Sequence, residues 1–150
     1  MKLNIGNKEL NIKFGYEPTL KERIISKTIK FSSTKGEDET ADVEKIEDLL
    51  LFLPELLLVG LQVHHKEYRY NYDTKEGKEE QLKKAFALVG EYMESEDADA
   101  MKLLTDLQET LMQDGFLKSL FQREQKKIEN VENIVETAQT AENNAIPTIA

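Results

Sequence analysis

The chain has 150 residues and carries 20 Lys and Arg against 29 Asp and Glu, which gives a formal net charge of -9. A chain of this length suits a single domain that buries about two thirds of its surface. It has no cysteine, which excludes disulfide frameworks, thiol nucleophiles and cysteine-ligated metal sites.

The charge is unevenly distributed along the chain. Residues 1–35 carry eight basic and three acidic side chains, a net charge of +5, whereas residues 36–150 have a net charge of -14. Because an acidic surface repels phosphate and anionic lipid, we expect neither nucleic-acid binding nor membrane-surface binding.

The first fourteen residues alternate apolar and polar side chains, which predicts a β-hairpin. The Gly6-Asn7 pair between the two runs is typical of a hairpin turn, since both residue types tolerate a positive φ. The apolar positions of the predicted hairpin are Leu3, Ile5, Leu10, Ile12 and Phe14.

A short helix is predicted next, beginning with a capping box in which the Thr19 hydroxyl and the Glu22 carboxylate bond each other's backbone amides. The sequence does not define where this helix ends, because Ile29 and Phe31 alternate with polar residues as they would in a third strand. We therefore expect a β-rich start over residues 1–35, with two or three strands.

Residues 42–65 predict a long central helix. Between residues 49 and 63, 11 of 15 side chains are apolar, a run too short for a membrane span and typical of a buried core helix. We expect this helix to be enclosed on most sides. Pro54 lacks the backbone amide, so it predicts a kink or a split at that point.

Three further helical segments follow. Apolar stripes predict the first two, at Leu82, Phe86, Val89 and Met93 and then at Met101, Leu104, Leu107 and Leu111. The third has apolar residues at three- and four-residue spacing, interrupted at Glu124, a pattern suited to docking on a partner helix. They are Leu117, Phe121, Ile128, Val131, Val135 and Ala138.

Together these elements predict an α+β fold in a single domain over residues 1–140. An N-terminal hairpin or small antiparallel sheet packs on a helical body of about four to five helices, which occupies residues 36–140. The last ten residues, 141–150, are predicted to form a flexible tail.

The sequence contains no recognised catalytic motif. His64 and His65 are adjacent, and neighbouring residues of a helix point about 100° apart, so they cannot reach one metal ion together. The carboxylate pairs lie in polar sequence that would not raise a pKa for acid–base chemistry. We predict no catalytic, cofactor-binding or metal-binding residue and a non-enzymatic function.

The run Tyr68-Arg69-Tyr70-Asn71-Tyr72 is the most unusual feature of the sequence. Tyr and Arg are enriched at binding hot spots because they offer large, rigid contacts with a polar group at the end. The run therefore has two interpretations. It contacts a partner, or its rings cover the end of the central helix.

Four segments, in this order, carry a family resemblance: MKLNIGNKELNIKFGY, PTLKERIISK, LLLFLPELLLVGLQ and EYRYNYDTKEGK. Over roughly residues 1–125 the chain resembles tail assembly chaperones of long-tailed phages that infect Gram-positive bacteria. The resemblance implies a protein of the host cytoplasm, absent from the finished tail. It would coat the tape measure protein, keep it soluble and help recruit tail tube subunits.

The resemblance also implies self-association around that long partner and, in many members, a longer product made by ribosomal frameshifting. The family offers no binding residues that match positions here. From the residues alone we expect the contact at Tyr68, Arg69, Tyr70 and Tyr72, or at Leu117, Phe121 and Ile128.

Two other classes remain open. Seven acids lie between Glu37 and Asp48, which suggests an acidic mimic of DNA that inhibits a nucleic-acid enzyme. A generic helical adaptor is the third alternative.

Overall fold

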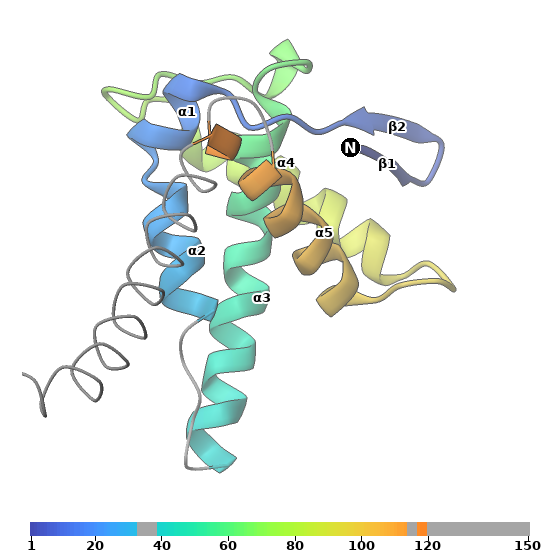
Figure 1. Cartoon of the computed structure of the whole chain (residues 1–150). Helices are drawn as coiled ribbons and strands as arrows, with labels where there is room; N and C mark the ends of the chain where they lie inside the picture. The colour runs from blue at the N-terminus through green and yellow to red at the C-terminus, as the bar shows by residue number, and fades with distance from the viewer. Residues whose placement is uncertain (33–38, 114–116, 120–150) are drawn as a thin grey trace, which may run out of the picture. The chain divides into compact units, whose positions relative to one another are not determined.

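The computed structural model describes residues 1–32, 39–113 and 117–119 of the chain (Figure 1). The chain divides into two compact units, Met1–Gly115 and Phe116–Ala150, whereas the sequence predicts one domain to residue 140. The fold class is α+β, as predicted. The elements below all belong to the first unit, and the predicted tail lies outside the described residues.

The predicted hairpin is confirmed. Strands β1 (Lys2–Ile5) and β2 (Lys8–Asn11) pair antiparallel, with Ile5 opposite Lys8. Gly6 has a φ of 59°, and a glycine with positive φ at the first turn position is typical of a type II′ hairpin. Along this segment the buried apolar residues are Ile5, Leu10, Ile12 and Phe14.

Two helices follow the hairpin: α1 (Tyr16–Lys21) and α2 (Ile24–Ser32). The third strand is therefore wrong, and so is the β-rich start as far as residue 35. The alternation at residues 29–31 is too short to distinguish a strand from a helix. Arg23, with a φ of 52°, separates the two helices.

The predicted capping box is also wrong. Helix α1 begins after Gly15, which makes no side-chain cap, and Thr19 is buried within the helix. Pro18 lies in the first turn, where its missing amide costs no intrahelical hydrogen bond.

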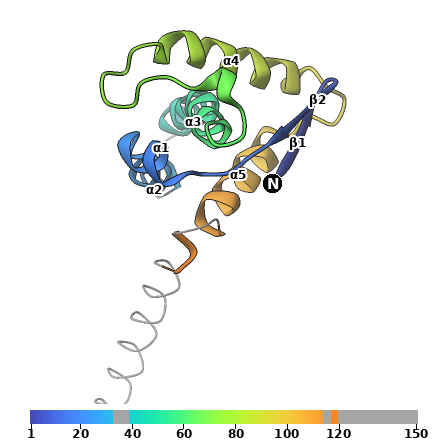
Figure 2. The same cartoon turned by 90° about the horizontal axis from the view of Figure 1, so that it is seen from above.

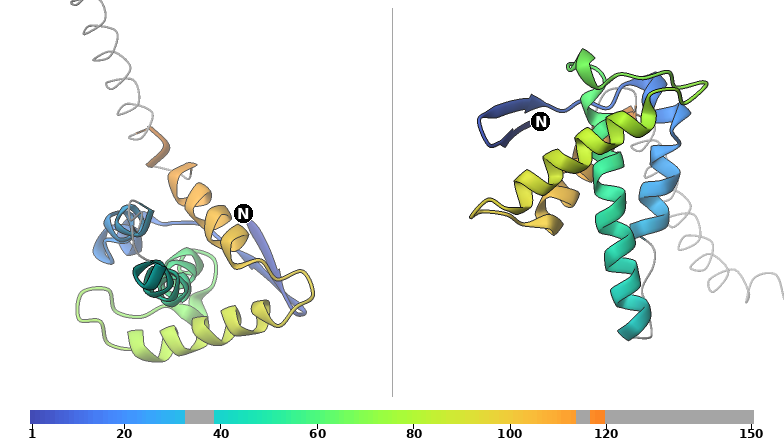
Figure 3. Two further views of the ribbon diagram at one scale, coloured as in Figure 1. Left: turned by 90° about the horizontal axis from the view of Figure 1, so that it is seen from below. Right: turned by 180° about the vertical axis from the view of Figure 1, so that it is seen from behind.

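The central helix, α3 (Glu39–Leu61), runs through Pro54 without splitting. The carbonyl that would have bonded the Pro54 amide belongs to Leu50, an exposed residue. In Figures 2 and 3, α3 is seen along its axis, with α1 and α2 on one side and the later helices on the others.

The remaining elements are the short 3₁₀ turn η1 (Lys66–Tyr68), α4 (Lys78–Met93) and α5 (Ala100–Gln113). The faces of α4 and α5 that are buried include Ala85, Leu88, Val89, Leu103, Leu104, Leu107 and Leu111. Phe86 and Met101, predicted on the apolar stripes, are exposed instead.

The segment after β2 lies very close to α3 at Gly60. The Lys13 amide donates to the Gly60 carbonyl at 2.9 Å. A Cβ on Gly60 would lie 2.7 Å from Cγ2 of Ile12 and 3.3 Å from Cζ of Phe14. Only glycine therefore permits this approach.

We expect Gly60→Ala to lower the free energy of unfolding by about 1–2 kcal/mol, because the added methyl group overpacks the contact with Ile12. The matched control is Gly90→Ala in α4, where a Cβ would meet nothing within 4 Å. This control should stabilise the chain by up to about 1 kcal/mol through helix propensity. Urea denaturation of both variants measures the difference, and equal effects would contradict the packing described here.

Candidate functional site

One apolar stripe runs along α3 at three- and four-residue spacing, through Val43, Ile46, Leu50, Leu53 and Leu57. Leu53 and Leu57 are fully buried in the core. The side chains of Val43, Ile46 and Leu50 are 55%, 53% and 40% exposed. We call these three residues the uncovered stripe.

The uncovered stripe corrects the expectation that the central helix is enclosed on most sides. Residues Phe52 to Gln62 are largely buried, whereas the first turns of α3 extend beyond the other helices of this unit (Figure 1). An apolar row that continues from a core into solvent is typical of a protein-binding surface.

Acidic side chains border the uncovered stripe. Glu47 lies four residues after Val43 and three before Leu50, so it is a neighbour of both on the helix surface. Glu44 lies one turn before Glu47, on the same side of the helix but farther from the stripe. Both are exposed, and among the described residues neither carboxylate forms an ion pair. We call Glu44 and Glu47 the acidic flank.

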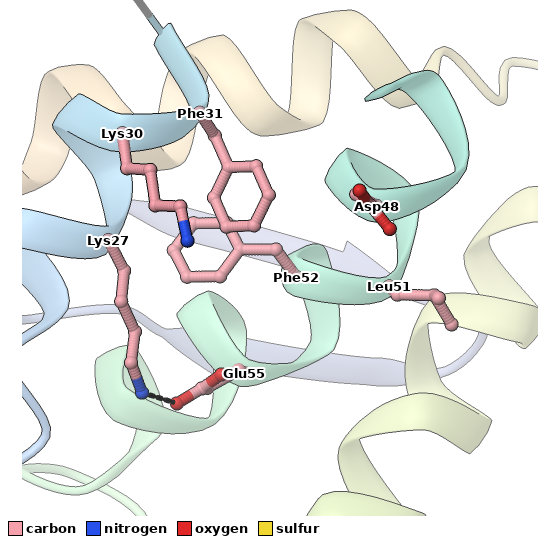
Figure 4. Close-up of a pocket in the computed structure, with 7 residues that line it drawn as sticks. All are labelled: Lys27, Lys30, Phe31, Asp48, Leu51, Phe52 and Glu55. Carbon is pink, nitrogen blue, oxygen red and sulfur yellow. Dashed lines mark hydrogen bonds and ion pairs between the residues drawn. The ribbon is translucent and has the colours of Figure 1, made fainter. Parts of the chain in front are cut away.

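On another side of α3, α2 packs against the helix (Figure 4). The rings of Phe31 and Phe52 stack with their centroids 4.8 Å apart. Lys27 donates to Glu55 at 2.5 Å. These contacts hold α2 along α3, and Leu51, at the edge of the same pocket, is exposed.

A buried carboxylate, Glu22, ties the α1–α2 junction to the start of α4. It accepts hydrogen bonds from the ammonium groups of Lys75 and Lys78. Lys78 also lies 3.5 Å from Glu55 on α3. The four groups form one network that fixes α2, α3 and α4 to each other.

The network sets the protonation of its members. Burial raises the pKa of Glu22, but hydrogen bonds from Lys75 and Lys78 outweigh this effect, and the pKa lies below its usual range. Burial, together with the nearby Glu22 carboxylate, raises the pKa of Tyr70 well above its ordinary value. Glu22 is therefore charged and Tyr70 neutral in the folded chain near pH 7.

The tyrosine run closes the C-terminal end of α3. Gln62 is buried, and its side-chain amide donates to the carbonyls of Leu58 and Tyr68 at 2.9 and 2.8 Å. The Tyr72 hydroxyl donates to Oε1 of Gln62 at 2.9 Å. Arg69 donates to the carbonyls of Gln62 and Val63.

These bonds satisfy carbonyls that a helix end leaves without partners. Tyr68 is buried in η1, and Tyr70 and Tyr72 meet edge to face with centroids 5.2 Å apart. Contacts within the unit thus account for the run, in agreement with the second of the two interpretations. A partner contact at Tyr68, Arg69, Tyr70 or Tyr72 remains a prediction.

The other predicted contact residues belong to the second unit. Leu117 lies in the described helical turn over residues 117–119. Phe121 and Ile128 lie outside the described residues. A partner contact at Leu117, Phe121 and Ile128 therefore stays a prediction.

His64 and His65 follow α3, which ends at Leu61. Nε2 of His65 accepts a hydrogen bond from the Asn11 amide at 2.9 Å and so links the hairpin to this end. Within the described ranges, no group of three or more metal-ligating side chains comes together. In the same part of the chain, no helix has the length and apolar character needed to cross a membrane.

No protein-family model, curated protein or solved structure matches the chain.

We expect Glu22→Gln to lower the free energy of unfolding at pH 7 by about 1–3 kcal/mol, because it removes the charge from two buried, charge-assisted hydrogen bonds. Since the pKa of Glu22 is lowered on folding, its contribution is present above its unfolded value of 4.5. The contribution is lost as the pH falls through the lower, folded pKa.

Urea denaturation from pH 7 to about pH 3 measures both effects. The variant should lose less stability on acidification than the natural chain. The control is Glu9→Gln, which breaks only an exposed pair with Lys2 and should change stability by less than about 0.5 kcal/mol. Identical acid profiles for the natural chain and Glu22→Gln would refute the role given to the network.

Proposed function

We propose that this chain is a non-enzymatic tail assembly chaperone of a long-tailed phage, acting in the host cytoplasm. Its client is the tape measure protein, which it keeps soluble while tail tube subunits are recruited. The sequence pattern supports this class of protein. The observation that carries a binding function is the uncovered stripe on α3.

The stripe suits a helical client for a physical reason. A long helical protein exposes rows of apolar side chains before assembly, and those rows aggregate unless they are covered. Val43, Ile46 and Leu50 offer an apolar surface of matching spacing. The net charge of -9 on each bound copy keeps the complex soluble.

In this proposal the client contacts α3, and the tyrosine run supports that helix. The bonds of Arg69 and Tyr72 to the end of α3 hold the helix in place, so the stripe is presented on a rigid element. Self-association and contact with a longer frameshifted form are further parts of the proposed function.

Co-expression of the full chain with the tape measure protein tests the proposal. We expect the tape measure protein to become soluble and to co-purify with several copies of this chain. Ile46→Glu should abolish most of this effect, since it places a charge in the uncovered stripe at a site that is 53% exposed.

The matched control is Phe86→Glu, which makes the same change of charge at an equally exposed apolar site on α4. It should leave co-purification intact. An insoluble tape measure protein with no bound chain would rule out the chaperone, and equal losses in both variants would remove α3 as the contact.

A further inference from the structure

The spacing of the uncovered stripe defines the secondary structure of its occupant. Val43, Ile46 and Leu50 continue the row that Leu53 and Leu57, both buried in the core, begin on the same helix. Side chains at alternating three- and four-residue spacing form the seam into which a second helix inserts its own side chains. A strand, with a period of two, would not match this row.

The acidic flank defines the charge of the occupant. Glu47 is exposed beside the seam and Glu44 is exposed one turn before Glu47 on the same side of α3, and no ion pair in the described part of the chain neutralises them. By contrast, Glu55, further along the same helix, is paired with Lys27. A helix that covers the seam must lie alongside the two free carboxylates.

The same charges argue against a second copy of this chain at this position. Antiparallel pairing of two copies of the α3 stripe would bring the flanking Glu47 of one copy to the side of Glu47 of the other, and like charges at a rim oppose association. Lys or Arg at the flanking positions of the occupant would instead form ion pairs across the seam.

We propose that the uncovered stripe and the acidic flank together bind one amphipathic helix of the partner protein, whose apolar seam is bordered by Lys or Arg. The proposal deepens the proposed function and rests on it, because it specifies which kind of client segment the chaperone selects. The apolar seam supplies contact area, and the flank excludes helices bordered by acids.

Synthetic helical peptides of about three heptads provide the probe. One has Leu at the seam and Lys at the flanking positions, and a second has the same seam with Glu at the flanks. A third keeps the Lys residues but has Ser in place of Leu. Like-charged flanks prevent each peptide from pairing with itself.

The full-length chain, labelled with ¹⁵N, is titrated with each peptide and followed by NMR, which detects the weak binding expected of a short seam. We expect the peptide with Leu and Lys to shift the amide signals of residues 43–51. The Glu-flanked and Ser-seam peptides should bind at least about tenfold more weakly. Added salt should weaken the preference for Lys, because it screens exposed charges.

Charge reversal gives the sharpest test. The double variant Glu44→Lys and Glu47→Lys should now prefer the Glu-flanked peptide. The matched control is Glu96→Lys with Asp97→Lys, an equal change of charge at exposed positions between α4 and α5. It should keep the original preference for the Lys-flanked peptide.

Three results would overturn the inference: equal binding of the Lys- and Glu-flanked peptides, equal binding of the Ser-seam peptide, or concentration-dependent shifts at residues 43–51 without peptide. The last would assign the stripe to a second copy. Because the peptides replace the tape measure protein, the inference and the proposed function fail separately. Co-purification without peptide preference rejects only the inference, and peptide preference without co-purification rejects only the function.

Discussion

Burial of the second half of α3 among the other elements of the first unit is the interaction on which the rest of this unit depends. Among the described residues, those from Phe52 to Gln62 supply six of the twelve largest fully buried side chains, and α2, α4 and α5 all contact this helix. Gly60 allows the chain after the hairpin to reach the same core. These elements cover one half of the helix, so its other half carries an apolar stripe into solvent.

Polar contacts keep that arrangement fixed. The buried Glu22, with Lys75 and Lys78, joins the α1–α2 junction to α4. Gln62 binds the tyrosine run to the end of α3 through hydrogen bonds. The Glu22 carboxylate and the Gln62 side chain are both buried and hydrogen-bonded, and such polar clusters favour one packing arrangement over alternatives. A helix held at its end and along its side presents its exposed turns in a defined position, which a binding surface requires.

Local signals were sufficient for part of this fold. The alternation around Gly6-Asn7 identified the hairpin, and the run of leucines identified the buried part of α3. The exposure of the Ile46 side chain was not predictable from the sequence, because it depends on how far along α3 the helices α4 and α5 extend. The role of Arg69 also depends on tertiary structure, since its guanidinium reaches carbonyls six and seven residues back. Two sequence signals fell near the candidate site: the acids between Glu37 and Asp48, and the apolar spacing that begins at Val43 and Ile46.

We propose that one continuous apolar stripe on α3 packs into the core at one end and binds a partner at the other. Equivalent truncations at its two ends, Leu57→Ala and Ile46→Ala, test this claim by urea denaturation of the free chain. The account predicts a loss of about 2–5 kcal/mol for Leu57→Ala and less than about 0.5 kcal/mol for Ile46→Ala. A comparable loss at both positions would show that the whole stripe belongs to the core and would contradict the account.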